Sequence, residues 1–179
     1  MNNKNMPIIV VSGAMGVGKS TIANILIARK SDRYVILKGD LCNFFAFPEV
    51  LSECRKVWVD VCLDIASQTN RAVVFYTDLD PDCFCGIEET KRKHMHFVAI
   101  VCDEEELKTR VESKCGEASH QRIRNIDKTW LEMSLLRNRV YSGQTKYQYP
   151  EMERIDTTHL NAEQSADLLD QWMTRILTK

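Results

Sequence analysis

The sequence lacks a surplus of charge of either sign. Its 179 residues include 24 Lys and Arg against 25 Asp and Glu, which gives a formal net charge of −1 at pH 7. A chain so close to neutral has no bulk electrostatic attraction for nucleic acid or for an anionic membrane surface, whatever local basic patch it carries. We therefore do not expect nucleic acid to be the partner of this protein.

Long apolar runs are also missing. No run approaches the length of a membrane span, and residues 1–7 are polar and lack the apolar centre of a signal peptide. The cysteines are odd in number and scattered, mostly among apolar residues, where cysteine behaves as a small buried hydrophobe. They are Cys42, Cys54, Cys62, Cys83, Cys85, Cys102 and Cys115. We therefore expect a cytoplasmic protein with reduced thiols and no membrane partner.

Internal repeats, low-complexity linkers and paired zinc-ligand spacings are absent as well. Cys83-Phe-Cys85 and His94-Met-His96 each place two metal-binding side chains close together, but neither has the spacing of a zinc site. Hydrophobic residues make up 44% and charged residues 27% of the chain, which is typical of a globular protein. Residues 1–179 are long enough for one compact domain, which is what we expect.

What the sequence does contain is a glycine-rich loop between an apolar run and a helical pattern. The run Ile8–Val11 precedes Gly-Ala-Met-Gly-Val-Gly-Lys-Ser-Thr, which fits G-x-x-x-x-G-K-[ST] at Gly13, Gly18, Lys19 and Ser20. Backbone N–H groups of such a loop form a concave nest for phosphate oxygens, and the following helix adds its positive dipole end. Lys19 offers a charge to the β- and γ-phosphates, and Ser20 offers a hydroxyl to Mg²⁺.

This stretch resembles the phosphate-binding loop of the P-loop nucleoside triphosphate proteins. The resemblance implies that the loop holds the nucleotide phosphates through nine consecutive residues: Gly13, Ala14, Met15, Gly16, Val17, Gly18, Lys19, Ser20 and Thr21. It does not distinguish a kinase from a motor or a GTPase, so the rest of the chain has to narrow the function.

Strand and helix patterns alternate along the chain. We expect strands at 7–12, 34–38, 72–76, 97–102 and 152–156, and helices at 19–30, 49–69, 88–94, 104–114, 128–146 and 162–177. This order predicts an α/β fold with a doubly wound, five-stranded parallel sheet. Ligands of such sheets gather at the carboxyl ends of the strands, where Gly13, Asp40, Asp78, Asp103 and Thr157 fall.

The helix expected at 49–69 has apolar residues at helical spacing, which predicts a buried face. Its members are Val50, Cys54, Val57, Trp58, Val61, Cys62 and Ile65.

Two acidic residues follow expected strands closely enough for phosphoryl-transfer chemistry. Asp78 comes directly after the strand at 72–76 and can bind Mg²⁺ through water, although an acidic turn before Pro81 is also common loop chemistry. Asp80 lies further from the strand end. Asp40 closes the strand at 34–38 and is suited to orient or deprotonate an acceptor hydroxyl, or to act on the metal side, unless it only caps a helix.

Cations gather between the fourth and fifth expected strands. Any one of them alone is more often part of a solvated helix face, but a hinged segment that brings cations over a phosphate site excludes water and stabilises transferring charge. The candidates are Arg110, Lys114, Arg122, Arg124, Arg137 and Arg139.

The C-terminal half resembles the adenylate kinase group of nucleoside monophosphate kinases and their small-molecule kinase relatives. The segment from Asp103 to Lys114 resembles the strand-4 aspartate and the helix that leads into that group's lid, which here covers residues 115–127, and Arg124-Asn-Ile-Asp127 loosely resembles its exit. The resemblance implies that Arg110 stacks on adenine and that Lys114 touches an ATP phosphate. It also implies that the backbone at Thr157, Thr158 and His159 holds the adenine.

The segment from Arg137 to Tyr141 resembles the same group's Arg-Leu-x-x-Tyr helix, which implies that Arg137 contacts the transferring phosphate. The acceptor side departs from the group. Gly39-Asp40-Leu41 matches the start of its Gly-Asp-x-Leu-Arg motif, but the position of the phosphate-gripping arginine holds Asn43. Its Gly-Phe-Pro-Arg is replaced by Thr77-Asp78-Leu79-Asp80.

Without these arginines, a dianionic acceptor would find few bidentate donors. On the acceptor side the chain therefore resembles gluconate kinase, shikimate kinase and chloramphenicol phosphotransferase more than the nucleoside monophosphate kinases. These proteins share the fold and keep an aspartate after strand 2. The aromatic residues Phe44, Phe45 and Phe47 either wall an apolar acceptor pocket or pack as ordinary core residues. Arg55, Lys56 and Trp58 also lie within reach of that side in sequence, although Trp58 fits the buried stripe as well.

The favoured hypothesis is an ATP-dependent small-molecule kinase acting as a monomer or homodimer. In it Lys19, Asp40 and Arg137 serve catalysis, and Ser20 and Asp78 hold Mg²⁺. Alternatives are a nucleoside or nucleotide kinase, with Arg55 or Lys56 replacing the missing phosphate grips, and an ATP- or GTP-binding regulatory module without a kinase acceptor. A kinase for nucleic-acid 5′ ends is disfavoured by the neutral charge.

Overall fold

The computed structural model of the chain describes residues 6–38, 48–116 and 128–178, apart from the side chains of residues 38, 48–53, 114–116 and 128–130. Its centre is a parallel sheet of five strands: β1 (Ile8–Ser12), β2 (Tyr34–Lys38), β3 (Ala72–Tyr76), β4 (Met95–Val101) and β5 (Met152–Asp156). The strand order is β2-β3-β1-β4-β5. The expected fold class is confirmed, and β1, which leads into the glycine-rich loop, lies in the middle of the sheet.

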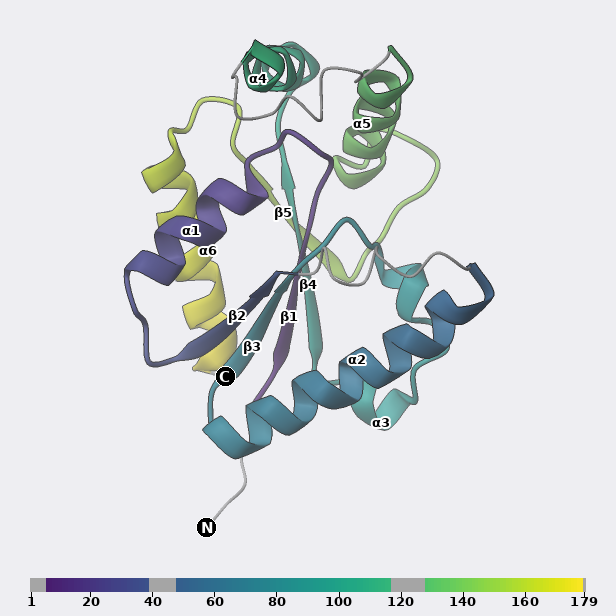
Figure 1. Cartoon of the computed structure of the whole chain (residues 1–179), viewed down its shortest axis with the longest axis vertical. Helices are drawn as coiled ribbons and strands as arrows, with labels where there is room; N and C mark the ends of the chain where they lie inside the picture. Colours follow the sequence, from purple (N-terminus) through teal and green to yellow (C-terminus); the bar gives the residue numbers. More distant parts are fainter. Residues whose placement is uncertain (1–5, 39–47, 117–127, 179) are drawn as a thin grey trace.

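Helices cover both faces of the sheet (Figure 1). On one face lie α1 (Lys19–Ala28) and α6 (Ala162–Leu177), and on the other lie α2 (Pro48–Thr69) and α3 (Glu89–Arg92). Because both faces are covered, β1 is apolar without alternation. Ile9 and Val11 enter the core beneath α1 and α6, whereas Ile8 and Val10 enter the core beneath α2.

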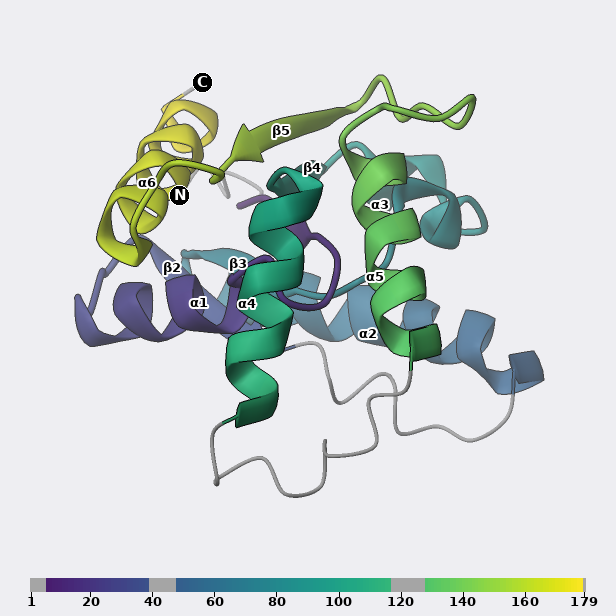
Figure 2. The same ribbon diagram turned by 90° about the horizontal axis from the view of Figure 1, so that it is seen from above.

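The two remaining helices, α4 (Glu104–Gly116) and α5 (Lys128–Tyr141), lie side by side over one end of the sheet (Figure 2). Leu107 and Val111 of α4 join the core on the α1 and α6 side, and Tyr141 of α5 joins the core on the α2 side. The side chain of Asn138 fastens α5 to the end of β4, because its amide donates to the Cys102 carbonyl at 2.5 Å and its oxygen accepts from the Cys102 N–H at 3.4 Å.

Several boundaries differ from those expected. β4 begins at Met95, α5 ends at Tyr141 instead of residue 146, and α4 continues through Gly116 into the first residues of the expected lid. The polar helix expected at 88–94 is only Glu89–Arg92, and the sequence reading missed the 3-10 helix η2 (Pro81–Phe84). Asp80 caps η2 by accepting from the Cys83 N–H at 3.2 Å, and Pro81 supplies the preset φ of a first helical residue.

The buried face that the sequence predicts for α2 is partly wrong. Val57 is 62% exposed and Val61 is 38% exposed, whereas Val59, Cys62 and Ala66 are the buried residues among the described side chains of the helix. Trp58 packs against Phe75 of β3, with ring centroids 5.9 Å apart. The helix is therefore rotated relative to the prediction, because its contact with the sheet and η2 selects the buried face.

Candidate functional site

The glycine-rich loop is held from both sides. Ala14 and Val17, two residues of the loop, have buried apolar side chains that anchor its backbone. Gly16 has a positive φ of 93°, and a Cβ there would lie 2.6 Å from Cγ2 of Val111 in α4. The loop therefore needs glycine at this position both for its backbone conformation and for its close packing on α4.

Lys19 curls back over the loop that precedes it. Its Nζ donates to the carbonyl of Gly13 at 2.7 Å and to that of Ala14 at 3.0 Å. Ser20 and Thr21 follow at the start of α1 with exposed side chains. A β-carbon at Gly18 would meet nothing within 4 Å. The ammonium, the two hydroxyls and the helix N-terminus thus lie where the loop opens to solvent, as an anion cradle requires.

A pocket of about 260 Å³ lies beside the loop. The loop and α1, α4, and the start of α6 each supply part of its wall, and the lining residues are Gly16, Val17, Gly18, Thr21, Ile22, Glu106, Arg110, Ser113, Leu160, Ala162 and Ser165. Its mixture of aliphatic walls and a few polar groups is typical of small-molecule sites. Its position against Gly18 and Thr21 suits the base and ribose of a nucleotide whose phosphates lie in the loop.

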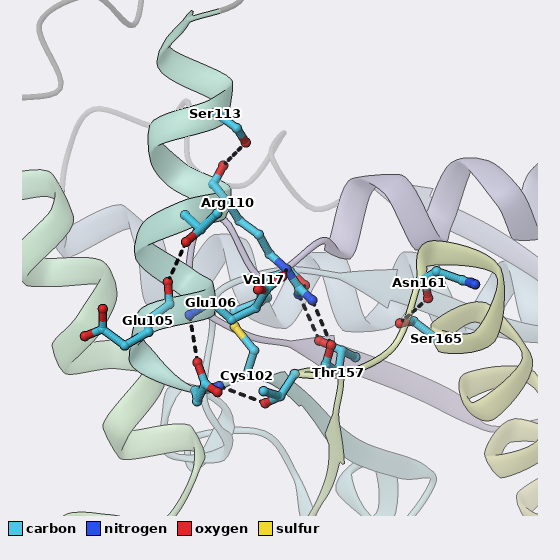
Figure 3. A network of polar contacts seen from close by, with 12 residues as sticks. Val17, Cys102, Glu105, Glu106, Arg110, Ser113, Thr157, Asn161 and Ser165 are labelled. Carbon is cyan, nitrogen blue, oxygen red and sulfur yellow. Dashed lines mark hydrogen bonds and ion pairs between the residues drawn. The ribbon is translucent and has the colours of Figure 1, made fainter.

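Arg110 forms the α4 side of this pocket and is fixed by four hydrogen bonds (Figure 3). Its Nη1 donates to the Val17 carbonyl at 3.2 Å and to Oγ1 of Thr157 at 3.0 Å, and its Nη2 donates to the Thr157 carbonyl at 2.7 Å. Its Nε donates to Glu106 at 2.7 Å. Two residues that the sequence placed at the adenine, Arg110 and Thr157, are therefore brought into direct contact.

Thr157 is buried at the carboxyl end of β5. Its N–H donates to the Val101 carbonyl at 2.8 Å, and its hydroxyl donates to the same oxygen at 3.0 Å. The Thr157 carbonyl is thereby directed to Arg110 on the opposite side. Burial raises the pKa of the neighbouring Cys102 thiol to about 11, against the opposing charge of Arg110. The thiol at this strand end is thus protonated at neutral pH.

The turn after β3 is tied to β1 at the start of the loop. The Thr77 N–H donates to the Val11 carbonyl at 3.0 Å, and the Ser12 hydroxyl donates to the Leu79 carbonyl at 2.5 Å. Asp78 is half-buried in this turn, and the Tyr141 hydroxyl of α5 donates to its carbonyl oxygen. The turn therefore holds Asp78 at the same edge of the sheet as the glycine-rich loop.

Arg137 of α5 meets this turn at Asp80. Its Nη1 lies 3.1 Å from a carboxylate oxygen of Asp80, and its Cζ lies 5.9 Å from the centroid of the Tyr141 ring. Burial opposes the charge of Arg137, yet Tyr141, Asp80 and Asp78 together raise its pKa. Asp80, which the sequence ranked below Asp78, is thus the carboxylate that engages the predicted phosphate-contacting arginine.

Other candidates are placed differently. Arg139 forms an exposed ion pair with Glu104, and Asp103 caps α4 by accepting from the Glu106 N–H at 2.7 Å. Asp40, Asn43, Phe44, Phe45, Phe47, Arg122, Arg124 and the lid residues 117–127 lie outside the described residues, as does the side chain of Lys114.

The sequence reading missed most of the pocket wall. Glu106, Ser113, Leu160, Ala162 and Ser165 carry no motif, because each is an ordinary residue of a helix or of its flank. The start of α6, which supplies part of the pocket wall, does carry a recognisable pattern. Asn161 and Gln164 form a reciprocal capping box there, and such a box can be found in a sequence.

The oxygen donors present suit a magnesium ion that arrives with phosphate. Within the described residues, no group of three or more His, Cys, Asp or Glu side chains could hold a metal ion. Mg²⁺ is commonly bound by one or two protein oxygens together with phosphates and waters. Ser20, with an exposed hydroxyl, and Asp78, half-buried after β3, supply oxygen ligands of the right kind. Among the described helices, none has the length and apolar character needed to cross a membrane.

Comparison with known proteins gives similarity at the level of structure alone. No family model and no curated protein matches the sequence. A gluconokinase from Sinorhizobium meliloti 1021 superposes with a TM-score of 0.60 at 16% identity, covering 97% of this chain and 95% of that one. A sugar kinase from Janibacter sp. HTCC2649 gives a TM-score of 0.56 at 17% identity, covering 94% and 95%.

A third solved structure holds a nucleotide. The YorR protein from Bacillus subtilis, in complex with phosphorylated GDP, gives a TM-score of 0.60 at 17% identity and covers 93% of this chain and 95% of that one. The loop, the all-parallel sheet and these neighbours agree: the chain has the fold of the P-loop kinases.

Proposed function

We propose that this protein is an ATP-dependent phosphotransferase that moves the γ-phosphoryl group to a hydroxyl of a small molecule lacking phosphate. The observation that carries the proposal is the pocket beside the glycine-rich loop, walled by Arg110, with Lys19 over the loop itself. A base pocket that opens onto a phosphate cradle has the arrangement that a nucleoside triphosphate requires.

In this proposal the loop, Lys19 and Arg110 bind the donor. The triphosphate displaces Lys19 from the carbonyls of Gly13 and Ala14, and the ammonium then contacts the β- and γ-phosphates. Ser20 and Asp78 hold Mg²⁺, which when bound neutralises charge on the phosphates. Arg137 adds positive charge at the transferring group, so that catalysis rests on positioning and electrostatic stabilisation.

The acceptor hydroxyl supplies the nucleophile. Its oxygen forms a bond to the γ-phosphorus while the bond to the β,γ-bridging oxygen breaks, and ADP leaves with that oxygen. Asp40 orients the hydroxyl and takes its proton, which then passes to solvent. The products are a phosphate monoester, ADP and one proton.

The charges around the turn after β3 support an acceptor without phosphate. Asp78, Asp80 and Asp82 lie in or beside this turn, and Arg137 is already paired with Asp80. A dianionic acceptor approaching here would be repelled by the negative charge of these carboxylates, of which Arg137 offsets only that of Asp80. A neutral or cationic hydroxyl compound avoids this repulsion.

A screen of ATP consumption over sugars, polyols, hydroxylated antibiotics and nucleosides tests the proposal. We expect at least one unphosphorylated hydroxyl compound to accelerate ADP formation, and mass spectrometry to find its phosphate monoester. Asp40→Asn should abolish transfer to that acceptor and leave ATP affinity nearly unchanged. Nucleotide binding with slow hydrolysis that no acceptor accelerates would instead indicate a regulatory module.

A nucleotide kinase is the second candidate, and Arg55 is the observation that favours it. Burial raises the pKa of the Cys83 thiol, and the charge of Arg55 opposes this rise, so Arg55 lies within electrostatic range of Cys83, whose backbone N–H donates to Asp80. In that case Arg55 grips the acceptor phosphate. Nucleoside monophosphates assayed beside nucleosides separate the two, and loss of monophosphate activity in Arg55→Ala would identify this second function.

A further inference from the structure

Asp80 combines burial with three separate contacts. The residue is 8% exposed, its carboxylate pairs with Arg137 at 3.1 Å, and its Oδ1 accepts from the Cys83 N–H at 3.2 Å. Tyr149 lies against the same carboxylate: burial raises its pKa to about 12, and the charges of Asp80 and Asp82 add to the rise. A carboxylate this enclosed is stable only with partners, so its orientation is strongly constrained.

The backbone that carries Asp80 is fixed relative to the phosphate loop. Leu79, its neighbour, accepts the hydroxyl of Ser12, the residue directly before Gly13. Pro81 follows and stiffens the start of η2. A short series of contacts therefore runs from the loop through Ser12 and Leu79 to Asp80, and from there to Arg137.

The contact with Asp80 occupies only part of the Arg137 guanidinium. The group has five N–H donors, and its hydrogen bond within the described residues runs from Nη1 to Asp80. Tyr141 lies within cation–π distance of the same group, and its hydroxyl binds the Asp78 carbonyl. Asp80 and Tyr141 thus orient the guanidinium and leave further N–H groups for oxygen atoms of a ligand.

The geometry points to Asp80 as the positioning residue for phosphoryl transfer, because it holds Arg137 at a fixed place relative to the phosphate loop. This role rests on the proposed function and deepens it. Asp80 touches neither donor nor acceptor and acts only through Arg137. Preorganising a cation before the substrate arrives avoids reorganisation during the reaction, which is where electrostatic catalysis gains its effect.

A double-mutant cycle tests this role, with the substitutions Asp80→Asn, Arg137→Ala and both together. Asparagine is as good a helix cap as aspartate, so Asp80→Asn removes the charge and keeps the cap of η2. In the otherwise wild-type protein, we expect kcat to fall about tenfold or more while KM for ATP changes by less than about twofold. In the Arg137→Ala background, the same substitution should change kcat by less than about twofold.

Equal losses of kcat in both backgrounds would overturn the proposal, because Asp80 would then act independently of Arg137. Asp80→Glu, which restores the charge on a longer side chain, should recover part of the lost kcat. A purely structural role would instead make both substitutions lower the midpoint of thermal unfolding in parallel with activity. The matched control is Glu104→Gln in α4, which weakens the exposed ion pair with Arg139, a residue of the same helix as Arg137. This substitution should leave kcat unchanged.

The same four proteins of the double-mutant cycle are also compared by their rates of slow ATP hydrolysis without an acceptor, in which water accepts the same phosphoryl group. This readout separates the two proposals. If no hydroxyl acceptor is found but the hydrolysis rates still show the expected non-additivity, the proposed function fails and the role of Asp80 stands. If an acceptor is found and the hydrolysis rates are additive, the proposed function stands and the role of Asp80 fails.

Discussion

Arg110 of α4 donates two hydrogen bonds to Thr157 at the end of β5, one to its hydroxyl at 3.0 Å and one to its carbonyl at 2.7 Å. The two residues are 47 positions apart in the chain. Their contact joins α4 to the end of β5, and Arg110 lines the pocket beside the phosphate loop. The arginine thus serves as a structural element of the pocket before any nucleotide binds.

Replacing Arg110 with alanine should weaken nucleotide binding. The change removes a pocket wall together with the bonds to Val17 and Thr157, so we expect the Kd for ATP to rise about tenfold or more. Isothermal titration calorimetry measures this. Lys108→Ala is the matched control, because Lys108 lies on the same helix and pairs only with exposed Glu105 in the described contacts. If the Kd for ATP were unchanged in Arg110→Ala, the pocket would not be part of the site that binds ATP.

Gly16→Ala should damage both the loop and its packing on α4. The new Cβ would lie 2.6 Å from Cγ2 of Val111 and 3.0 Å from Cδ1 of Leu107, at a φ of 93° that alanine rarely adopts. We expect the free energy of unfolding to fall by about 2 kcal/mol or more, with ATP binding lost in parallel. Gly86→Ala, whose Cβ would meet only Cε of Lys56, at 3.7 Å, among the described residues, should change stability by less than about 0.5 kcal/mol. Urea unfolding compares the two.

Alkaline pH should destabilise the fold through Cys102. Its thiol ionises near 9.0 when the chain is unfolded but only near 11 when folded, chiefly because of burial. Between these values the folded state binds more protons, so the free energy of unfolding falls as pH rises, by at most about 1.4 kcal/mol per pH unit. Its contribution is complete below pH 9. Cys102→Ala should flatten this slope, whereas Cys85→Ala, at an exposed thiol, should leave it unaltered.

The corrected face of α2 can be tested by two substitutions. Val57 is 62% exposed, so Val57→Lys should change the free energy of unfolding by less than about 0.5 kcal/mol. Val59 is 3% exposed, and Val59→Ala should cost about 1 to 3 kcal/mol through lost contacts and a small cavity. If Val57→Lys were the more destabilising of the two in thermal unfolding, the stripe predicted from the sequence would be right and the observed face wrong.

Local patterns predicted much of the fold. The strands at 34–38, 72–76 and 152–156 and the helix at 162–177 match the structure, because β-branched runs, turn residues and the cap at Asn161 act over a few positions. The boundaries failed where distant contacts decide them. α5 stops at Tyr141, beside the positive-φ turn at Gly143, although its sequence pattern continues.

The candidate site divides in the same way. The loop at Gly13–Ser20 was recognisable from spacing alone, since its function depends on consecutive backbone groups and on the helix that follows directly. Arg110, Thr157 and Arg137 were located through resemblance to a family. The contacts that these arginines make were not predicted, because Thr157 lies 47 positions from Arg110 and Asp80 lies 57 positions from Arg137 in the chain.

The sequence by itself determined the phosphate loop, the fold class and the neutral charge balance, all of which follow from short-range patterns or composition. Only the tertiary structure decided that Asp80, and not Asp78, engages Arg137, and that Val57 faces solvent. The physical reason is common to both. Which of several chemically similar side chains is buried or paired depends on the packing of whole elements against one another, and that packing is settled by contacts between residues far apart in the chain.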